Sequence, residues 1–168
     1  IAAVLIEPGL AEGGNWIPSK KFIEGIRKIC DKHGWLMIAD EVLTGLGRTA
    51  EMWGMDHYKV IPDMLIVGKN LSGGIAPCAG VATRDEILGN NPSASSGSTF
   101  AGTPAGCAAG LKTLEIYKRD KVIDHAKKLA QIAKLRMKPW CEKYSIVSET
   151  RQLGLLMGIS FNLPAVSY

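Results

Sequence analysis

The fold of this chain is decided by two apolar runs, Leu36-Met37-Ile38-Ala39-Asp40 and Met64-Leu65-Ile66-Val67-Gly68-Lys69. Both have the length of a strand, and neither alternates between apolar and polar residues. Such runs are typical of strands that are covered on both faces in a parallel sheet. Ligands of open α/β sheets bind at the carboxyl ends of the strands. We therefore expect Asp40 and Lys69 to face the same crevice.

An acid and an amine at one crevice suit a cofactor with a basic ring nitrogen and a reactive aldehyde. Asp40 would keep the nitrogen protonated, and Lys69 would form a Schiff base with the aldehyde. Opposite charges ~4 Å apart attract by about 4 kcal/mol at an effective dielectric of ~20. Pyridoxal 5'-phosphate carries both reactive groups, so the pair predicts a site for this cofactor.

The residues around this pair resemble the class III aminotransferases, which include the ornithine, acetylornithine, 4-aminobutyrate and other ω-amino acid transaminases. The stretch Asp-Glu-Val-Leu-Thr-Gly-Leu-Gly-Arg-Thr at 40–49 resembles the family signature. Three further blocks follow in the family's order, and together the blocks span about residues 1–110. They are Glu7-Pro8 with Glu12-Gly13-Gly14 and Pro18; Pro62-Asp63 with Gly68-Lys69, Gly73-Gly74 and Pro77; and Ser98-Thr99-Phe100 with Pro104. Gly-Lys alone is a weak signal, whereas four ordered blocks are a specific one.

The resemblance implies an α/β fold of the fold-type I pyridoxal-phosphate class, with a mostly parallel central sheet and flanking helices. Residues 1–118 would form part of the large cofactor-binding domain, and 119–145 would form a linking helix. Residues 146–168 would begin a smaller, truncated C-terminal α+β domain. Because the chain starts at Ile1 with a strand-like run, we expect a central fragment of such an enzyme.

Local signals predict where the helices and strands lie. Ser19 after Pro18 is a plausible N-cap and Gly34 a helix stop, and Thr103 with Pro104 predicts another helix start. Small residues in that second helix would allow close backbone approach. The expected strands are 3–6, 35–40, 64–67, 78–83, 146–147 and 155–160; the expected helices are 19–34, about 51–58, 103 onward and 121–139, with a loop at 89–99.

The resemblance also implies roles for other residues. Val42 would press against the cofactor ring, with a plain core valine as the less favoured alternative. Ser98 and Thr99 would reach the cofactor phosphate of a partner subunit, although hydroxyls in such loops usually satisfy local backbone groups. Glu7 would lie near the substrate and pair with an arginine beyond residue 168. Glu41 belongs to the signature, but the sequence assigns it no chemical step.

These implications predict transfer of an amino group between an amine or (ω-)amino acid and a 2-oxo acid, with Lys69, Asp40 and Glu7 as catalytic residues. Many members of the family have a Gln at the position of Leu43, where it hydrogen-bonds the ring hydroxyl of the cofactor. Leu43 cannot make this bond, so the sequence favours the broader ω-amino acid group over the ornithine and acetylornithine types. We expect a homodimer with shared active sites, and we expect these 168 residues alone to be inactive. Aminomutase, decarboxylase or lyase chemistry on the same fold and cofactor stays open.

Two other interpretations fit less well. A P-loop ATPase would need G-x-x-x-x-G-K-[ST], but Asn70 follows the lysine and Asp63 stands at the first glycine. A non-catalytic relative would have no reason to retain both Asp40 and Lys69.

The composition is that of an ordinary globular protein, with 46% hydrophobic and 21% charged residues. No apolar run approaches the roughly 20 residues of a membrane span. The net charge of +4 comes from residues 118–138, which lack interleaved aromatics, so nucleic-acid binding is not favoured. The four cysteines form no C-x-x-C motif, so we expect no metal and read them as buried apolar residues. We expect a cytoplasmic enzyme, with an organellar matrix as the alternative.

Overall fold

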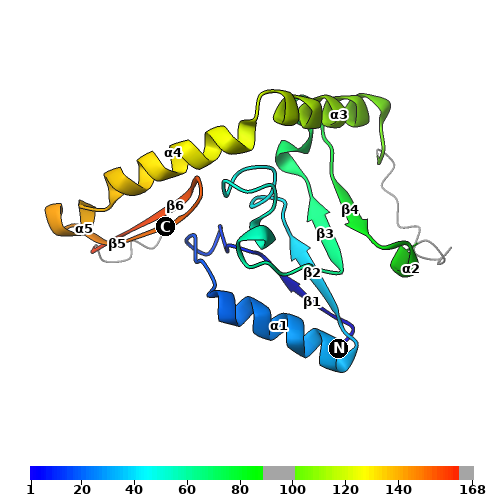
Figure 1. Cartoon of the computed structure of the whole chain (residues 1–168), viewed down its shortest axis with the longest axis horizontal. Coiled ribbons are helices and arrows are strands. Elements are labelled where there is room, and N and C mark those ends of the chain that lie inside the picture. Colours follow the sequence, from blue (N-terminus) through cyan, green and yellow to red (C-terminus); the bar gives the residue numbers. More distant parts are fainter. Residues whose placement is uncertain (89–100, 163–168) are drawn as a thin grey trace, which may run out of the picture.

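A four-stranded sheet forms the centre of the computed structural model, which describes residues 1–88 and 101–162 (Figure 1). Its order is β1 (Ala3–Ile6), β2 (Leu36–Asp40), β3 (Met64–Val67) and β4 (Gly80–Thr83). The first three strands are parallel and β4 is antiparallel to β3. The prediction of a mostly parallel sheet is confirmed, and both apolar runs are strands.

Helix α1 (Lys20–His33) forms where its capping residues predict it. The Ser19 hydroxyl accepts a hydrogen bond from the backbone N–H of Phe22 at 3.2 Å, which satisfies one free donor of the first turn. Gly34 ends the helix with φ +67°, a left-handed conformation that glycine adopts without a steric penalty.

Helix α1 covers one face of the sheet (Figure 1). Met37 and Ala39 of β2 point to this face and are completely buried, whereas Ile38 and Asp40 point to the other face. Leu5 of β1 lies on that other face and is 61% exposed. The described residues therefore bury one face of the sheet and leave much of the second accessible. The core on the covered face consists of Ile23, Cys30, Met37, Ala39, Met55 and Tyr58.

Short helices occupy the connections. The expected helix near 51–58 is a 3-10 helix, η1 (Gly54–His57). A second 3-10 helix, η2 (Lys69–Ser72), follows β3 directly, and α2 (Asp85–Leu88) follows β4. The loop expected at 89–99 lies outside the described residues.

The C-terminal part contains helices α3 (Pro104–Arg119), α4 (Val122–Met137) and α5 (Trp140–Lys143). Strands β5 (Val147–Leu153) and β6 (Leu156–Phe161) then form an antiparallel hairpin that is a sheet of its own. Figure 1 shows α4 leading away from the central sheet with this hairpin beside it. The helix start at Pro104 is confirmed, although the Thr103 side chain makes no capping hydrogen bond.

The hairpin turn packs directly on the end of the 40–49 segment. Gly154 has φ +63°, and a Cβ there would lie 1.9 Å from the carbonyl carbon of Thr49. The backbone N–H of Leu155 donates to the carbonyl of Arg48 at 3.0 Å. Ala126 and Ala130 of α4 bury their methyl groups against Ala50 in the same region.

Some surface features differ from expectation. Cys30 is buried as expected, but Cys107 and Cys141 are exposed, so reading all the cysteines as buried was wrong for these two.

Across residues 1–88 and 101–162, no helix has both the length and the apolar character needed to cross a membrane. The same residues contain no cluster of three or more His, Cys, Asp or Glu side chains able to hold a metal ion.

Candidate active site

Asp40 stands at the carboxyl end of β2, beside β3. It pairs in register with Ile66, and the next backbone N–H, that of Glu41, donates to the Ile66 carbonyl at 2.9 Å. The Asp40 carboxylate accepts a hydrogen bond from the backbone N–H of Val42 at 3.0 Å through Oδ1. This bond fixes the orientation of the carboxylate and leaves Oδ2 available to another donor.

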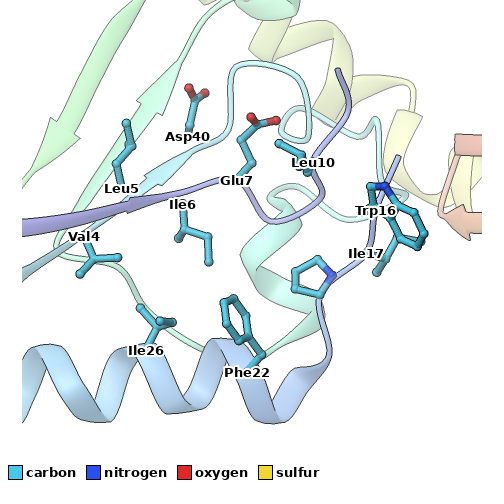
Figure 2. Close-up of a pocket in the computed structure, with 11 residues that line it drawn as sticks. Val4, Leu5, Ile6, Glu7, Leu10, Trp16, Ile17, Phe22, Ile26 and Asp40 are labelled. Carbon is cyan, nitrogen blue, oxygen red and sulfur yellow. The ribbon is translucent and has the colours of Figure 1, made fainter. Parts of the chain in front are cut away.

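Glu7 follows β1 and lies in the same pocket as Asp40. The pocket has a volume of about 560 Å³. Figure 2 shows Asp40, Glu7 and Leu5 pointing to one side of the sheet, whereas Val4 and Ile6 point towards α1. Because β1 is the outermost strand of the described sheet, this pocket includes its unpaired edge, where backbone groups are free to bind another strand. The remaining lining residues are mainly apolar: Leu10, Trp16, Ile17, Pro18, Phe22 and Ile26.

Lys69 stands at the carboxyl end of the neighbouring strand, β3, where η2 begins. Its side chain is exposed, and its φ of +45° is one of six positive values at non-glycine positions among the described residues. Such a conformation is sparsely populated and occurs often at functional sites. The lysine lines a second pocket of about 720 Å³, formed by the β3–β4 connection and the start of α3.

Asp40 and Lys69 therefore occupy adjacent strand ends but line different pockets of the described chain. Both residues stand at strand ends as expected, but the described residues do not place them in one crevice. Val42 packs between these segments, since its Cγ1 and Cγ2 would lie 3.5 and 3.6 Å from a Cβ at Gly68, the residue before Lys69. Val42 thus lies against the residue that precedes Lys69.

Helix α3 supports the segment that carries Lys69. A Cβ at Gly106 would lie 2.9 Å from the carbonyl oxygen of Pro77, so the helix backbone approaches this segment closely, as expected from its small residues. The buried Ser72 hydroxyl donates to the Ala76 carbonyl and closes the turn after η2.

Glu41, to which the sequence assigned no chemical step, has contacts that sequence reasoning did not predict. Its side chain is 2% exposed and lies among three donors. The Thr44 hydroxyl donates to it at 2.5 Å, and the backbone N–H groups of Gly54 and Met55 donate at 2.8 Å each. Burial raises the pKa of Glu41, although these hydrogen bonds act in the opposite direction. The available signal was its place next to Asp40 in the signature.

The donor set fits pyridoxal phosphate at its reactive end. The carboxylate of Asp40 has a free oxygen for a protonated ring nitrogen, Lys69 offers an exposed primary amine for an aldehyde, and Val42 presents an apolar surface beside both segments. Ser98 and Thr99, the residues predicted to bind the phosphate, lie outside the described residues.

Comparison with known proteins places the chain in a family. A family model described as Aminotransferase class-III matches residues 1–167. The chain is 40% identical over 161 residues to an uncharacterised aminotransferase of Archaeoglobus fulgidus, covering 94% of this chain and 38% of that protein. It is 35% identical over 170 residues to ornithine aminotransferase 1 of Staphylococcus aureus, covering 99% of this chain and 42% of the relative.

A similar solved structure is the taurine:2-oxoglutarate aminotransferase from Bifidobacterium kashiwanohense, described in complex with PLP and glutamate. It has a TM-score of 0.89 and 33% identity, covering 95% of this chain and 36% of that chain. This likeness confirms the fold-type I architecture. The chain spans about two fifths of the length of these relatives. It belongs to the class III aminotransferases, a family of pyridoxal-phosphate-dependent enzymes.

Proposed function

We propose that the complete protein transfers an amino group between an amine or (ω-)amino acid and a 2-oxo acid. The observation that carries the proposal is the presence of Asp40 and Lys69 at the carboxyl ends of adjacent parallel strands in a class III aminotransferase chain. Relatives named for ornithine and for taurine:2-oxoglutarate support this reaction class. When bound, pyridoxal phosphate supplies an electron-withdrawing ring conjugated to the substrate.

Lys69 would hold the cofactor through its amine, and the same amine would move a proton to or from the substrate Cα. Its position directly after β3, held by η2 and α3, limits how far the amine can travel. Because its side chain is exposed in the described chain, the amine is free to reach a cofactor bound between the two strand ends.

Asp40 keeps a proton on the cofactor ring nitrogen. The Val42 N–H orients the carboxylate, so little reorganisation is needed when a positive charge forms opposite it. Opposite charges ~4 Å apart attract by about 4 kcal/mol at an effective dielectric of ~20, so a carboxylate at this position would favour the protonated ring. Val42 itself limits the position of the ring from one side.

Glu7, Ser98 and Thr99 complete the proposed site. Glu7 shares the pocket of Asp40, and its Oε2 accepts from the Ala11 N–H at 3.4 Å; the shared pocket supports a role for Glu7 near the substrate. Ser98 and Thr99 would reach the cofactor phosphate of a partner subunit. A homodimer with shared sites follows from this assignment, and we place it in the cytoplasm or an organellar matrix.

The domain division is part of the same proposal: residues 1–118 belong to the large domain, 119–145 link it, and 146–168 begin the small one. Apolar side chains such as Ile61 and Ile75, which are 85% and 84% exposed, support burial of this surface by further segments or a second subunit. We also propose that the 168 residues alone are inactive.

The test uses the full-length protein loaded with pyridoxal phosphate. A panel of amino donors is added without any 2-oxo acid, and the expected result is one equivalent of oxo product and one equivalent of aminated cofactor per site. Release of carbon dioxide or of an isomerised amine instead would indicate decarboxylase or aminomutase chemistry. Absence of both the oxo product and the aminated cofactor with every donor would contradict amino transfer.

A further inference from the structure

We infer that Glu41 is a positioning residue of this site: its buried carboxylate ties the segment after Asp40 to the 3-10 helix η1. The inference rests on the proposed function, because it concerns how Asp40 is held for its role at the cofactor. Glu41 touches neither pocket of the candidate site, so it acts through Asp40 rather than on substrate.

The tie depends on donors from two places in the chain. The Gly54 and Met55 N–H groups belong to the first turn of η1, where backbone donors have no partner within the helix. The Thr44 hydroxyl comes from the loop that follows β2. The Glu41 carboxylate therefore connects the end of β2 to Gly54 and Met55, which lie 13 and 14 positions further along the sequence.

The alternation of an extended strand explains why Glu41 positions its neighbour. Successive side chains point to opposite faces, so Asp40 points into the open pocket while Glu41 points into the protein. The backbone between them is fixed by the Glu41 N–H, which donates to Ile66 of β3. A shift of the Glu41 side chain would therefore rotate the peptide that carries Asp40.

A second bond links the same helix to the end of β1. The Tyr58 hydroxyl, at the end of η1, donates to the Pro8 carbonyl at 2.7 Å, and Pro8 directly follows Glu7. Gly54 permits this approach, because a Cβ there would lie 2.7 Å from the Pro8 Cβ. Helix η1 and its C-cap residue Tyr58 thus contact Glu41, which follows Asp40, and Pro8, which follows Glu7.

The burial of Glu41 decides what a substitution there would change. A buried carboxylate loses much of its hydration, and the hydrogen bonds from Thr44, Gly54 and Met55 offset that cost; an apolar residue would leave these donors without a partner. Burial together with the charge of Glu41 raises the pKa of Tyr58 to about 12, so that hydroxyl remains a donor at any physiological pH. The charged residue gives directed hydrogen bonds that an apolar one could not give.

The experiment compares Glu41→Gln with Asp56→Asn in the full-length, cofactor-loaded enzyme. Glutamine keeps the size but turns a donor group towards an N–H of η1. Asp56 caps the same helix from its exposed side, accepting from the Trp53 N–H at 3.0 Å, and is the matched control. We expect Glu41→Gln to lower kcat about 10- to 100-fold with KM within about threefold, because small misplacement of reacting groups has such effects.

A readout apart from activity is the pH midpoint of the bound cofactor's visible absorbance, together with cofactor affinity. We expect Glu41→Gln to move the midpoint in the same direction as Asp40→Asn, and Asp56→Asn to leave it at the parental value. Equal effects of Glu41→Gln and Asp56→Asn on kcat, midpoint and thermal midpoint would overturn the inference in favour of plain helix stabilisation.

A milder variant covers the case in which Glu41→Gln does not fold. Thr44→Val removes one of the three donors and should give a smaller shift of kcat and absorbance midpoint in the same direction. Loss of folding in both variants, or parental values in a folded one, would contradict positioning. Failure of the proposed function is recognised separately, because the parent enzyme would then form no aminated cofactor.

Discussion

Asp63 and Arg27 form an ion pair of 2.7 Å that joins helix α1 to the start of β3. The same carboxylate accepts from the Met37 N–H at 2.8 Å and contacts Arg84 at 2.9 Å. One side chain therefore links α1, β2, β3 and the end of β4. This junction lies at the amino ends of the parallel strands, opposite the candidate site.

We expect Asp63→Asn to destabilise the protein by about 1–3 kcal/mol at pH 7, because it weakens hydrogen bonds to charged groups at a mostly buried position. Burial alone would raise the pKa of Asp63, but the Met37 N–H and the two guanidinium groups outweigh it and lower the pKa. The stabilisation that the Asp63 carboxylate gives to the folded protein is therefore complete above the unfolded-state pKa of this carboxyl group. It is lost as the pH falls through the lower pKa of the folded state.

Urea unfolding of the full-length protein between pH 7 and pH 3 measures this effect. The difference between parent and Asp63→Asn should shrink towards acid pH. The control is Asp120→Asn, whose carboxylate pairs with Arg119 on the exposed surface and should leave the urea midpoint unchanged. A constant difference across the pH range would show that charge is not what Asp63 contributes.

Lys69→Ala should abolish turnover and prevent borohydride from fixing the cofactor to the chain. The control is Lys59→Ala, which removes another exposed lysine whose backbone φ is also positive, +57° against +45°. Both variants place alanine at a position with positive φ, so both change the backbone strain in a similar way. Only Lys69→Ala removes the amine proposed to bind the cofactor. Peptide mapping by mass spectrometry locates the reduced adduct, and an adduct that persists in Lys69→Ala would mean that another residue carries the cofactor.

How far the sequence predicts this fold is seen at α1 and at β4. The caps Ser19 and Gly34 are local, so the sequence predicts the bounds of α1 within a residue or two. The strand at 78–83 is also predictable from its residues, but its antiparallel direction depends on how the connection after Lys69 turns back along β3. That turn is stabilised by α3, which lies some 30 residues further on.

The candidate site likewise divides into features that depend on local sequence and features that depend on distant segments. Asp40 and Lys69 were predictable because apolar runs mark strand ends, and strand ends mark ligand sites. The contacts of Glu41 were not, because a helix start 13 residues away provides its donors and a buried carboxylate breaks the usual rule for charged residues. The separate pockets of Asp40 and Lys69 depend equally on which segments cover the sheet.

Asp40→Asn should reduce kcat more than cofactor affinity. Asparagine keeps the size and the Val42 hydrogen bond but loses the charge opposite the ring nitrogen. Loss of about 4 kcal/mol of attraction corresponds to about 1000-fold in rate at most, so we expect a fall of about 100- to 1000-fold with a cofactor Kd within about tenfold. Single-turnover kinetics and cofactor titration measure the two quantities. With Asp124→Asn as an exposed control, equal rates in Asp40→Asn and parent would exclude the assignment.

A shared active site predicts complementation between two inactive mutants. A Lys69→Ala homodimer lacks the amine in both sites, and a double Ser98→Ala, Thr99→Ala homodimer lacks the phosphate hydroxyls. Mixed dimers should contain one site with all these groups intact, so activity should recover towards one quarter of the parent in an equimolar mixture. If subunit exchange is confirmed by native mass spectrometry and no activity returns, each subunit completes its own site.

The turn at Gly154 sets a limit for protein engineering. Its Cα lies so close to Thr49 that any side chain would occupy the space of the backbone at the end of the signature segment. A library that varies the β5–β6 hairpin can therefore alter the residues on either side of the turn but has to keep glycine at 154. A substitution there would first be noticed at residues 40–49, more than one hundred positions earlier in the sequence.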